Sequence, residues 1–301
     1  MHAHWKWLAA AALAVTVSTA HAALNVFATV PEWAALTEEL GGDKVRVYMA
    51  TSALQDPHHI EAKPSLIARA RSADLVVATG AELEVGWLPL VMQQAGNPKL
   101  RPGQPGYFEA ANYVTLLDKP ARLDRAEGDV HPQGDPHIQG DPRNIARVAT
   151  ALAARLAELD PANAETYRAR FKAFDDRWRA AIGRWEREAA PLKETPVLVQ
   201  HKGFTYLIAW LGLKEIAALE PKPGVEPTVS YLSEVLATVG RQPAKMVLRS
   251  AYQSDRPSLW IAERAKINPV VLPFTVGGDA EAKDLTSLFD DTIARLLKGA
   301  Q

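Results

Sequence analysis

Three histidines in separate loop segments have the side-chain chemistry of a metal site. His58 and His137 each follow an Asp-Pro pair, and His201 comes directly after a run typical of a strand. Proline fixes its own backbone torsion and favours extended geometry in the residue before it, so both Asp-Pro-His loops should be stiff. A stiff loop suits a metal ligand, because part of its ordering entropy is lost before the ion arrives. Three converging imidazoles would favour zinc, whereas manganese sites rely more on carboxylate oxygen.

Local spacing alone does not decide for a metal site. A lone histidine in a polar loop is usually exposed or bonded to backbone, and Asp-Pro-His can be only a turn. The chain has no His-x-x-x-His or His-Glu-x-x-His motif of the kind that places two ligands on one helix. From the residues alone, a metal site and a set of polar turns remain open as alternatives.

The elements that must position these histidines alternate between strands and helices. Short β-branched runs bounded by turn residues predict strands, and apolar residues at helical spacing lie between them, often after a first-turn proline. This alternation predicts mostly parallel sheets covered by helices on both faces. The predicted strands are 24–30, 44–50, 74–80, 196–200, 213–219, 245–249 and 268–274, and the predicted helices are 31–42, 64–73, 141–159, 162–190, 204–211, 230–239, 257–266 and 285–298.

The helical run 162–190 divides the chain into two parts. At nearly thirty residues it predicts a helix of roughly 40 Å, longer than a small domain is wide. We therefore expect an α/β fold of two lobes, each a mostly parallel sheet with flanking helices, joined by one long helix. The expected units are an N-terminal lobe (23–160), the linking helix (161–190) and a C-terminal lobe (191–301), with the ligand cleft between the lobes.

Composition indicates an exported, soluble protein. The 301-residue chain is 48% hydrophobic and 23% charged, and Lys6 before the apolar run 8–17, then Ala-His-Ala, predicts a signal peptide (1–22) cleaved after Ala22. The absence of cysteine excludes disulfides, thiolate ligands and a cysteine-linked lipid. A formal net charge of −1 argues against a nucleic-acid partner. We expect a periplasmic monomer whose mature chain keeps five histidines: His58, His59, His131, His137 and His201.

Four segments resemble the zinc and manganese substrate-binding proteins of ABC importers. They are "QDPHHIEAKPSLIARARSADLVVATGAELEVGWL", "GDPHIQGDPRNIARVATAL", "VQHKGFTYLIAWLGL" and "EPKPGVEPTVSYL", and together with the long central helix they cover essentially the whole mature chain in the family's order. The resemblance implies two α/β lobes with a metal ion between them. It also implies that the motif histidines His58, His137 and His201 are ligands, and that the protein works with an ABC permease of the inner membrane.

The fourth ligand is the point where this chain departs from the family pattern. The family usually supplies an Asp directly after its last strand, but here the strand end is Pro273-Phe274 and the nearest acid is Asp279. We take Asp279 as the expected fourth ligand, with His59, Glu61 or a water as alternatives in that order. His131 is expected to be exposed to solvent, with a contact to the site as the alternative.

Three function hypotheses follow from these residues. The first is a periplasmic protein that binds Zn²⁺ (Mn²⁺ as second choice) as transported ligand, catalyses no reaction and passes the ion to a permease. The second is a secreted zinc hydrolase, in which Glu61 would act as base beside an open zinc position. The third is an adhesin or structural module whose histidines only stabilise the lobe interface. The motif match favours the first hypothesis.

Overall fold

The computed structural model describes residues 22–120, 128 and 131–301. Its first lobe contains a sheet of strands β1 (Leu24–Ala28), β2 (Val45–Met49), β3 (Leu75–Ala78) and β4 (Tyr107–Glu109), which pair in the order β2-β1-β3-β4. All three strand pairs are parallel. The predicted signal peptide lies outside the described residues except for Ala22.

The second lobe repeats this arrangement. Strands β5 (Pro196–Val199), β6 (Lys214–Ala218), β7 (Met246–Ser250) and β8 (Asn268–Leu272) pair in the order β6-β5-β7-β8, again all parallel. In both sheets the first strand of the lobe lies between the second and the third. Connections therefore leave the carboxyl ends of neighbouring strands in different directions, which opens a crevice where open α/β sheets bind ligands.

Helices cover both faces of each sheet. In the first lobe these are α1 (Pro31–Gly41), α2 (Pro64–Ser72), α3 (Leu88–Ala95) and α4 (Pro142–Leu159), and in the second lobe α6 (Thr205–Leu211), α7 (Val229–Arg241), α8 (Arg256–Ala265) and α9 (Leu285–Gly299). Short 3-10 helices are η1 (Gly42–Lys44), η2 (Pro98–Leu100), η3 (Ala110–Tyr113), η5 (Ile138–Gly140), η6 (Pro161–Asn163) and η7 (Ala190–Leu192).

Sequence features at the helix ends explain where several of these helices begin. Proline occupies the first turn of α1, α2, α3, α4 and α8, where its missing N–H removes no helical bond. Asp141 accepts a hydrogen bond from the backbone N–H of Arg143 and caps α4. Asp284 and Ser287 form a reciprocal capping box at the start of α9.

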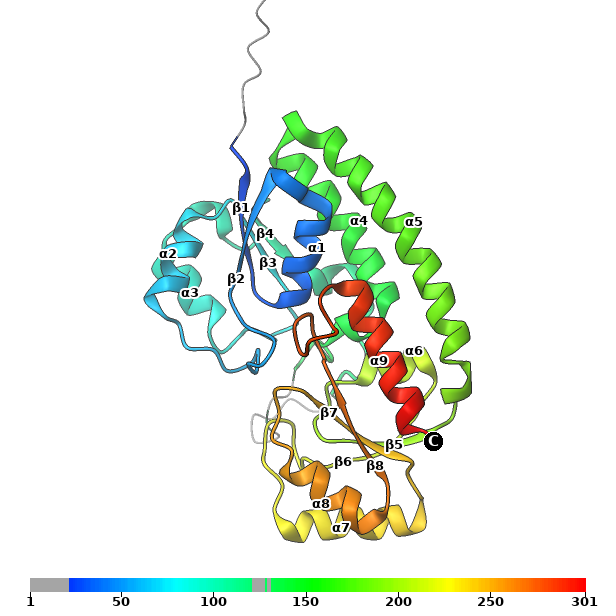
Figure 1. The fold of residues 1–301 in the computed structure, drawn as a ribbon. Coiled ribbons are helices and arrows are strands. Elements are labelled where there is room, and N and C mark those ends of the chain that lie inside the picture. The colour runs from blue at the N-terminus through cyan, green and yellow to red at the C-terminus, as the bar shows by residue number, and fades with distance from the viewer. Residues whose placement is uncertain (1–21, 121–127, 129–130) are drawn as a thin grey trace, which may run out of the picture.

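Helix α5 (Ala164–Glu188) joins the two lobes. Figure 1 shows it as the long green helix alongside the first lobe and down to the second, with α4 and α9 beside it. Its buried Trp178 and Trp185 pack on Phe289 of α9, with ring centroids 5.6 and 5.1 Å away. These rings belong to one apolar core that runs through both lobes, while α2 and α3, and α7 and α8, cover two smaller cores. The lobes are thus fastened to a shared rigid element.

The expected fold class is confirmed: two parallel sheets with flanking helices and a long helix between the lobes. The sequence analysis did not predict β4, because this strand has only three residues and lies among turn-forming glycines and prolines. Within the described part of the chain, no helix is both long and apolar enough to cross a membrane. The domain boundaries proposed from the sequence stay a prediction.

Candidate metal centre

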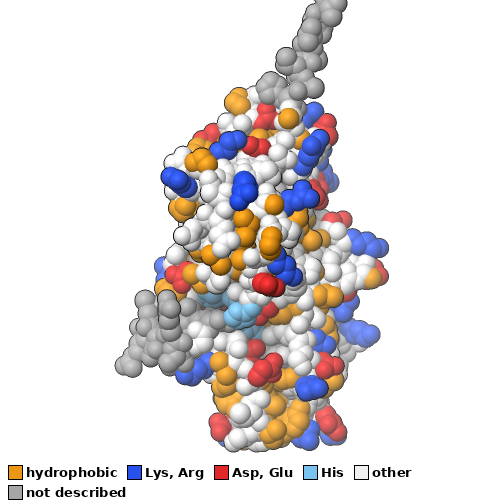
Figure 2. Space-filling model, turned by 90° about the vertical axis from the view of Figure 1, so that its left-hand side faces the viewer, with side chains coloured by type: hydrophobic (Ala, Val, Ile, Leu, Met, Phe, Trp, Pro, Cys, Tyr) orange, Lys and Arg blue, Asp and Glu red, His pale blue; other side chains and the backbone are white. Residues whose placement is uncertain are grey.

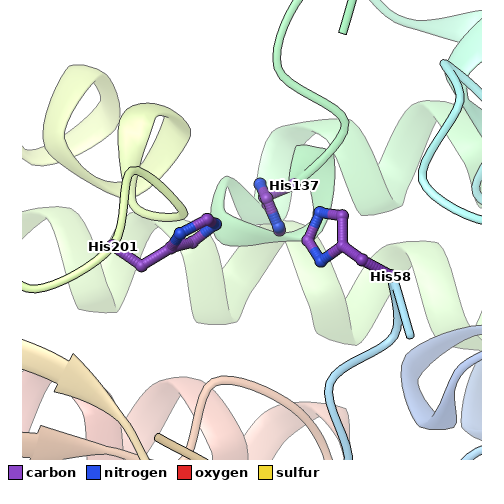
Figure 3. Close-up of side chains that lie close together, drawn as sticks. All are labelled: His58, His137 and His201. Carbon is purple, nitrogen blue, oxygen red and sulfur yellow. The ribbon is translucent and has the colours of Figure 1, made fainter. Parts of the chain in front are cut away.

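Three buried histidines meet between the two lobes. His58 follows β2, His137 precedes α4, and His201 is the second residue after β5, at the carboxyl edge of its sheet. Their ring centroids are 5.2 Å (His58 to His137), 5.6 Å (His137 to His201) and 5.8 Å (His58 to His201) apart. Figure 3 shows the three rings pointing toward one another from separate segments. Two lobes therefore contribute to one centre.

The Asp-Pro-His tripeptide occurs twice in the chain and forms the same local structure each time. Asp56 accepts hydrogen bonds from the backbone N–H of His58 at 3.0 Å, and its carboxylate lies 2.8 Å from Nδ1 of the same residue. Asp135 makes the matching contacts to His137, at 2.8 and 2.7 Å. An Asx turn with a proline at its centre thus fixes both the backbone and the ring of each histidine.

His201 is oriented by a carboxylate from a different element. Its Nδ1 lies 2.8 Å from Oε2 of Glu220, which follows β6, the strand beside β5. Glu220 is itself held by the backbone N–H of Gly224 at 2.8 Å. All three histidines therefore have Nδ1 bonded to a carboxylate, a common way of fixing the tautomer and raising the basicity of a metal-ligating imidazole.

The other ring nitrogens have the arrangement of a metal site. Nε2 of His58 and of His137 is buried and has no hydrogen-bond partner among the described residues, which is unusual for a buried polar atom. One ligand atom from each of the three histidines lies within 4.8 Å of the other two. In a tetrahedral zinc site the ligand nitrogens lie about 3.4 Å from one another. The ligand nitrogens of the three histidines would therefore have to move closer together by no more than about 1.5 Å to bind the ion. The donor set fits a transition metal ion.

Burial and the carboxylates set the charge of this centre. Burial alone would raise the pKa of Asp56 and Asp135, but the contacts with their histidines prevail and lower each pKa to about 2. Burial lowers the pKa of His137 despite the opposing effect of Asp135, which favours the neutral ring. For His201, burial acts to lower the pKa, yet the hydrogen bond and charge of Glu220 outweigh it and raise the pKa.

His131 corrects one expectation. It is half-buried rather than exposed, its ring centroid lies 5.3 Å from that of His58, and burial together with the neighbouring histidines lowers its pKa to about 3. A turn in which Gly134 N–H donates to the carbonyl of His131 folds this residue back toward the centre. His131, His137 and His201 line a cavity of about 320 Å³ with Lys202. Figure 2 shows histidines gathered where the lobes meet.

Asp279 is placed away from the histidines. Its carboxylate lies 2.6 Å from Nη2 of Arg295 in α9 and accepts hydrogen bonds from the backbone N–H groups of Glu281 and Ala282. Asp279 therefore holds its own loop against α9, and it does not belong to the cluster of ligand atoms formed by His58, His137 and His201. The residue that this loop presents to the centre is Phe274, whose ring lies 5.6 Å from that of His137.

Four other residues lie around the His58 loop or at the nearby strand ends. His59 and Glu61 are exposed at the surface beside the His58 loop. Trp87 is buried, and its indole N–H donates to the carbonyl of Pro57 at 2.9 Å and so holds that loop. Glu84 accepts hydrogen bonds from Thr29, Thr79 and Gly80 and ties the ends of β1 and β3 together.

Two residues that carry no role in the sequence analysis support the centre. Glu220, described above, follows a strand at its carboxyl end, which is the only sequence feature that could have indicated it. Tyr206 of α6 lies in the quoted segment after His201, and its hydroxyl donates to the carbonyl of Asp135 at 2.7 Å. Because Tyr206 belongs to the second lobe, it links that lobe to the His137 loop.

Comparison with known proteins decides the family. The chain matches the family model of ZnuA, described as zinc-uptake complex component A, periplasmic, over residues 26–299. The chain belongs to this family. The expected membership of the metal-binding substrate-binding proteins of ABC importers is thereby confirmed.

Two relatives of this ZnuA family member are named as substrate-binding lipoproteins of metal ABC transporters. The chain is 28% identical over 165 residues to the metal ABC transporter substrate-binding lipoprotein ScbA of Streptococcus cristatus, covering 55% of this chain and 51% of ScbA. It is 22% identical over 281 residues to the manganese ABC transporter substrate-binding lipoprotein PsaA of Streptococcus pneumoniae, covering 90% and 81%. The chain thus spans about half the length of ScbA.

A solved structure confirms the fold of this ZnuA family member. A crystal structure of ZnuA superimposes with a TM-score of 0.77 at 25% sequence identity, covering 93% of this chain and all of that one. The match includes both lobes and the connecting helix.

Proposed function

We propose that this protein is a periplasmic carrier that captures a zinc ion between its lobes and delivers it to an ABC permease in the inner membrane. The lobes are residues 23–160 and 191–301, on either side of the linking helix 161–190, and the exported chain is a monomer cleaved after Ala22. It catalyses no reaction. The zinc ligands are His58, His137 and His201.

One observation carries this proposal: three imidazoles have Nδ1 bonded to carboxylates, and one ring nitrogen from each lies within 4.8 Å of the other two. Neutral nitrogen donors favour zinc over manganese, which takes more oxygen ligands. Glu61, the base that the hydrolase alternative requires, is exposed at the surface, and Asp135 and Glu220 at the centre are bonded to Nδ1 of His137 and His201. The interlobe position suits capture and release of an ion, which a purely structural role would not require.

Metal binding by the purified protein tests the ligand set. Zinc at a thousandfold excess over its dissociation constant should stabilise the folded protein by about 4 kcal/mol. Replacing His58, His137 or His201 by Ala should remove most of that effect, whereas His59→Ala, next to His58 but exposed, should keep it. Equal responses of all four variants would contradict the assignment.

Delivery is tested in cells that lack the chain. Such cells should grow slowly when zinc is chelated, and added zinc should restore growth. Restoration by manganese alone would instead identify the carrier as a manganese protein, the second choice. Competition between the two ions for the purified protein gives the same distinction in vitro.

A further inference from the structure

The loop between β8 and α9 reaches from the second lobe to the first beside the metal centre. Thr275 in this loop donates a hydrogen bond from its hydroxyl to Oε2 of Glu32 in the first turn of α1. Both side chains are buried, with exposed fractions of 6% and 2%. A Cβ placed on Gly277 would lie 3.6 Å from Cβ of Ala53, in the segment that leads to His58. The loop therefore contacts the first lobe through Thr275 and passes close to it at Gly277.

Phe274, the residue before Thr275, packs on the metal centre. Its ring centroid lies 5.6 Å from those of His137 and Tyr252, and 5.7 Å from that of Phe204. A Cβ on Gly203 would lie 3.2 Å from Cδ2 of His201 and 3.3 Å from Cε2 of Phe274, so both rings pack against the same glycine. An apolar ring thus covers the side of the centre that faces the second lobe.

The backbone of Phe274 is held in an unfavourable conformation. Its φ is +69°, in the left-handed region that bulky residues rarely adopt. Such a conformation costs on the order of 1–3 kcal/mol and persists only where the surroundings enforce it. The hydrogen bond from Thr275 to Glu32 acts on the very next residue and supplies such a restraint. Without it, the loop could relax and withdraw the ring.

We infer that Glu32 is a positioning residue for the metal centre, acting through Thr275 to hold Phe274 against His137. The ring then denies that side of the ion to water and to additional oxygen ligands, and leaves the ion open toward the cavity that His131 lines. This inference rests on the proposed function and concerns the same centre. It makes an interlobe hydrogen bond part of what sets the coordination number.

Cobalt(II) is a suitable probe, because it takes the place of zinc and its visible absorption is intense in four-coordinate sites and weak in six-coordinate ones. Thr275→Val keeps the shape of the side chain but removes the donor. Its cobalt complex should lose most of the visible intensity, and zinc should dissociate about tenfold faster. Thr275→Ser and Glu32→Gln each keep the hydrogen bond and should restore the wild-type spectrum.

A matched control separates positioning from simple loss of stability. Thr37 of α1 is equally buried, and its hydroxyl donates to the carbonyl of Trp33 within the same helix, away from the loop. Thr37→Val should lower the melting temperature while leaving the cobalt spectrum unchanged. Phe274→Leu, which removes the ring directly, should reproduce the spectrum of Thr275→Val even if the latter folds poorly.

The outcomes keep the two proposals apart. A wild-type protein that binds neither cobalt nor zinc would overturn the proposed function itself. A wild-type protein that binds both, with unchanged cobalt spectra and zinc dissociation rates in Thr275→Val and Phe274→Leu, would overturn only the positioning role of Glu32.

Discussion

Nδ1 of His201 lies 2.8 Å from Oε2 of Glu220, and the two residues follow neighbouring strands of the second sheet. This contact has an electrostatic consequence, because it makes His201 more basic despite its burial. The hydrogen bond and the charge of Glu220 raise the pKa of His201. A metal ion must displace that proton before it can bind.

Glu220→Gln should therefore change the pH dependence of zinc binding. In the wild type His201 becomes protonated at a higher pH than an ordinary histidine, so zinc affinity should begin to fall early as the pH drops. The amide removes the charge that raises the pKa and leaves burial, which lowers it, so the fall should begin at lower pH. At pH 8 the less basic ring should bind zinc about 10 to 100 times more weakly.

Chelator competition between pH 5 and 8 measures both effects. Asp279→Asn removes a carboxylate that contacts Arg295 instead of a histidine and is the control. Parallel curves for the wild type and Glu220→Gln would show that Glu220 does not govern the protonation of His201.

His131→Ala should weaken zinc binding to an intermediate degree. Because its pKa is lowered to about 3, His131 is neutral at physiological pH and has a lone pair available beside His58. Its ligand atoms are nevertheless outside the close three-histidine group. We expect about a tenfold loss of affinity by isothermal titration, against a much larger loss for His137→Ala. A zinc affinity of His131→Ala identical to that of the wild type would show that His131 lines the cavity but does not contribute to zinc binding.

The positions of the histidines could be predicted from the sequence, but only those partners that are close in the chain could be predicted with them. Asp56 and Asp135 are two residues away from their histidines, so a local turn predicts the contact. Glu220 meets His201 only because β6 lies beside β5, and the order of strands in a sheet is not encoded in local periodicity. Asp279 was misplaced for a related reason: the distance along a loop does not show which side chain turns inward.

Glu32→Gln should stabilise the protein at neutral pH. Burial, aided by the charge of Glu84 and opposed by Thr275, raises the pKa of Glu32 from 4.5 to about 7. Below pH 4.5 the carboxyl is protonated whether the chain is folded or unfolded, so it has no effect. Between pH 4.5 and 7 the unfolded chain loses this proton first, which lowers the free energy of unfolding.

The glutamine side chain of Glu32→Gln does not ionise in this pH range, so the unfolding free energy of the variant does not fall in this way. The difference in unfolding free energy between Glu32→Gln and the wild type should grow by about 3 kcal/mol from pH 4 to pH 8. Urea denaturation at several pH values measures it. A constant difference would mean that Glu32 titrates near its ordinary value in the folded protein.

Trp87→Phe should loosen the His58 loop more than it destabilises the core. Phenylalanine keeps an aromatic ring in the core beneath α2 and α3 but cannot donate to the carbonyl of Pro57. An unmade hydrogen bond to a buried acceptor costs about 1–3 kcal/mol, and here the loss falls on the residue before the ligand. Zinc should dissociate several-fold faster.

Trp33→Phe, which removes the indole donor to Thr79 at the end of β3, is the matched control. Because Thr79 is not next to a ligand, that variant should lose stability while keeping the dissociation rate of zinc. Stopped-flow release into a chelator distinguishes the two variants, and equal rates for both would refute a special role for the bond to Pro57.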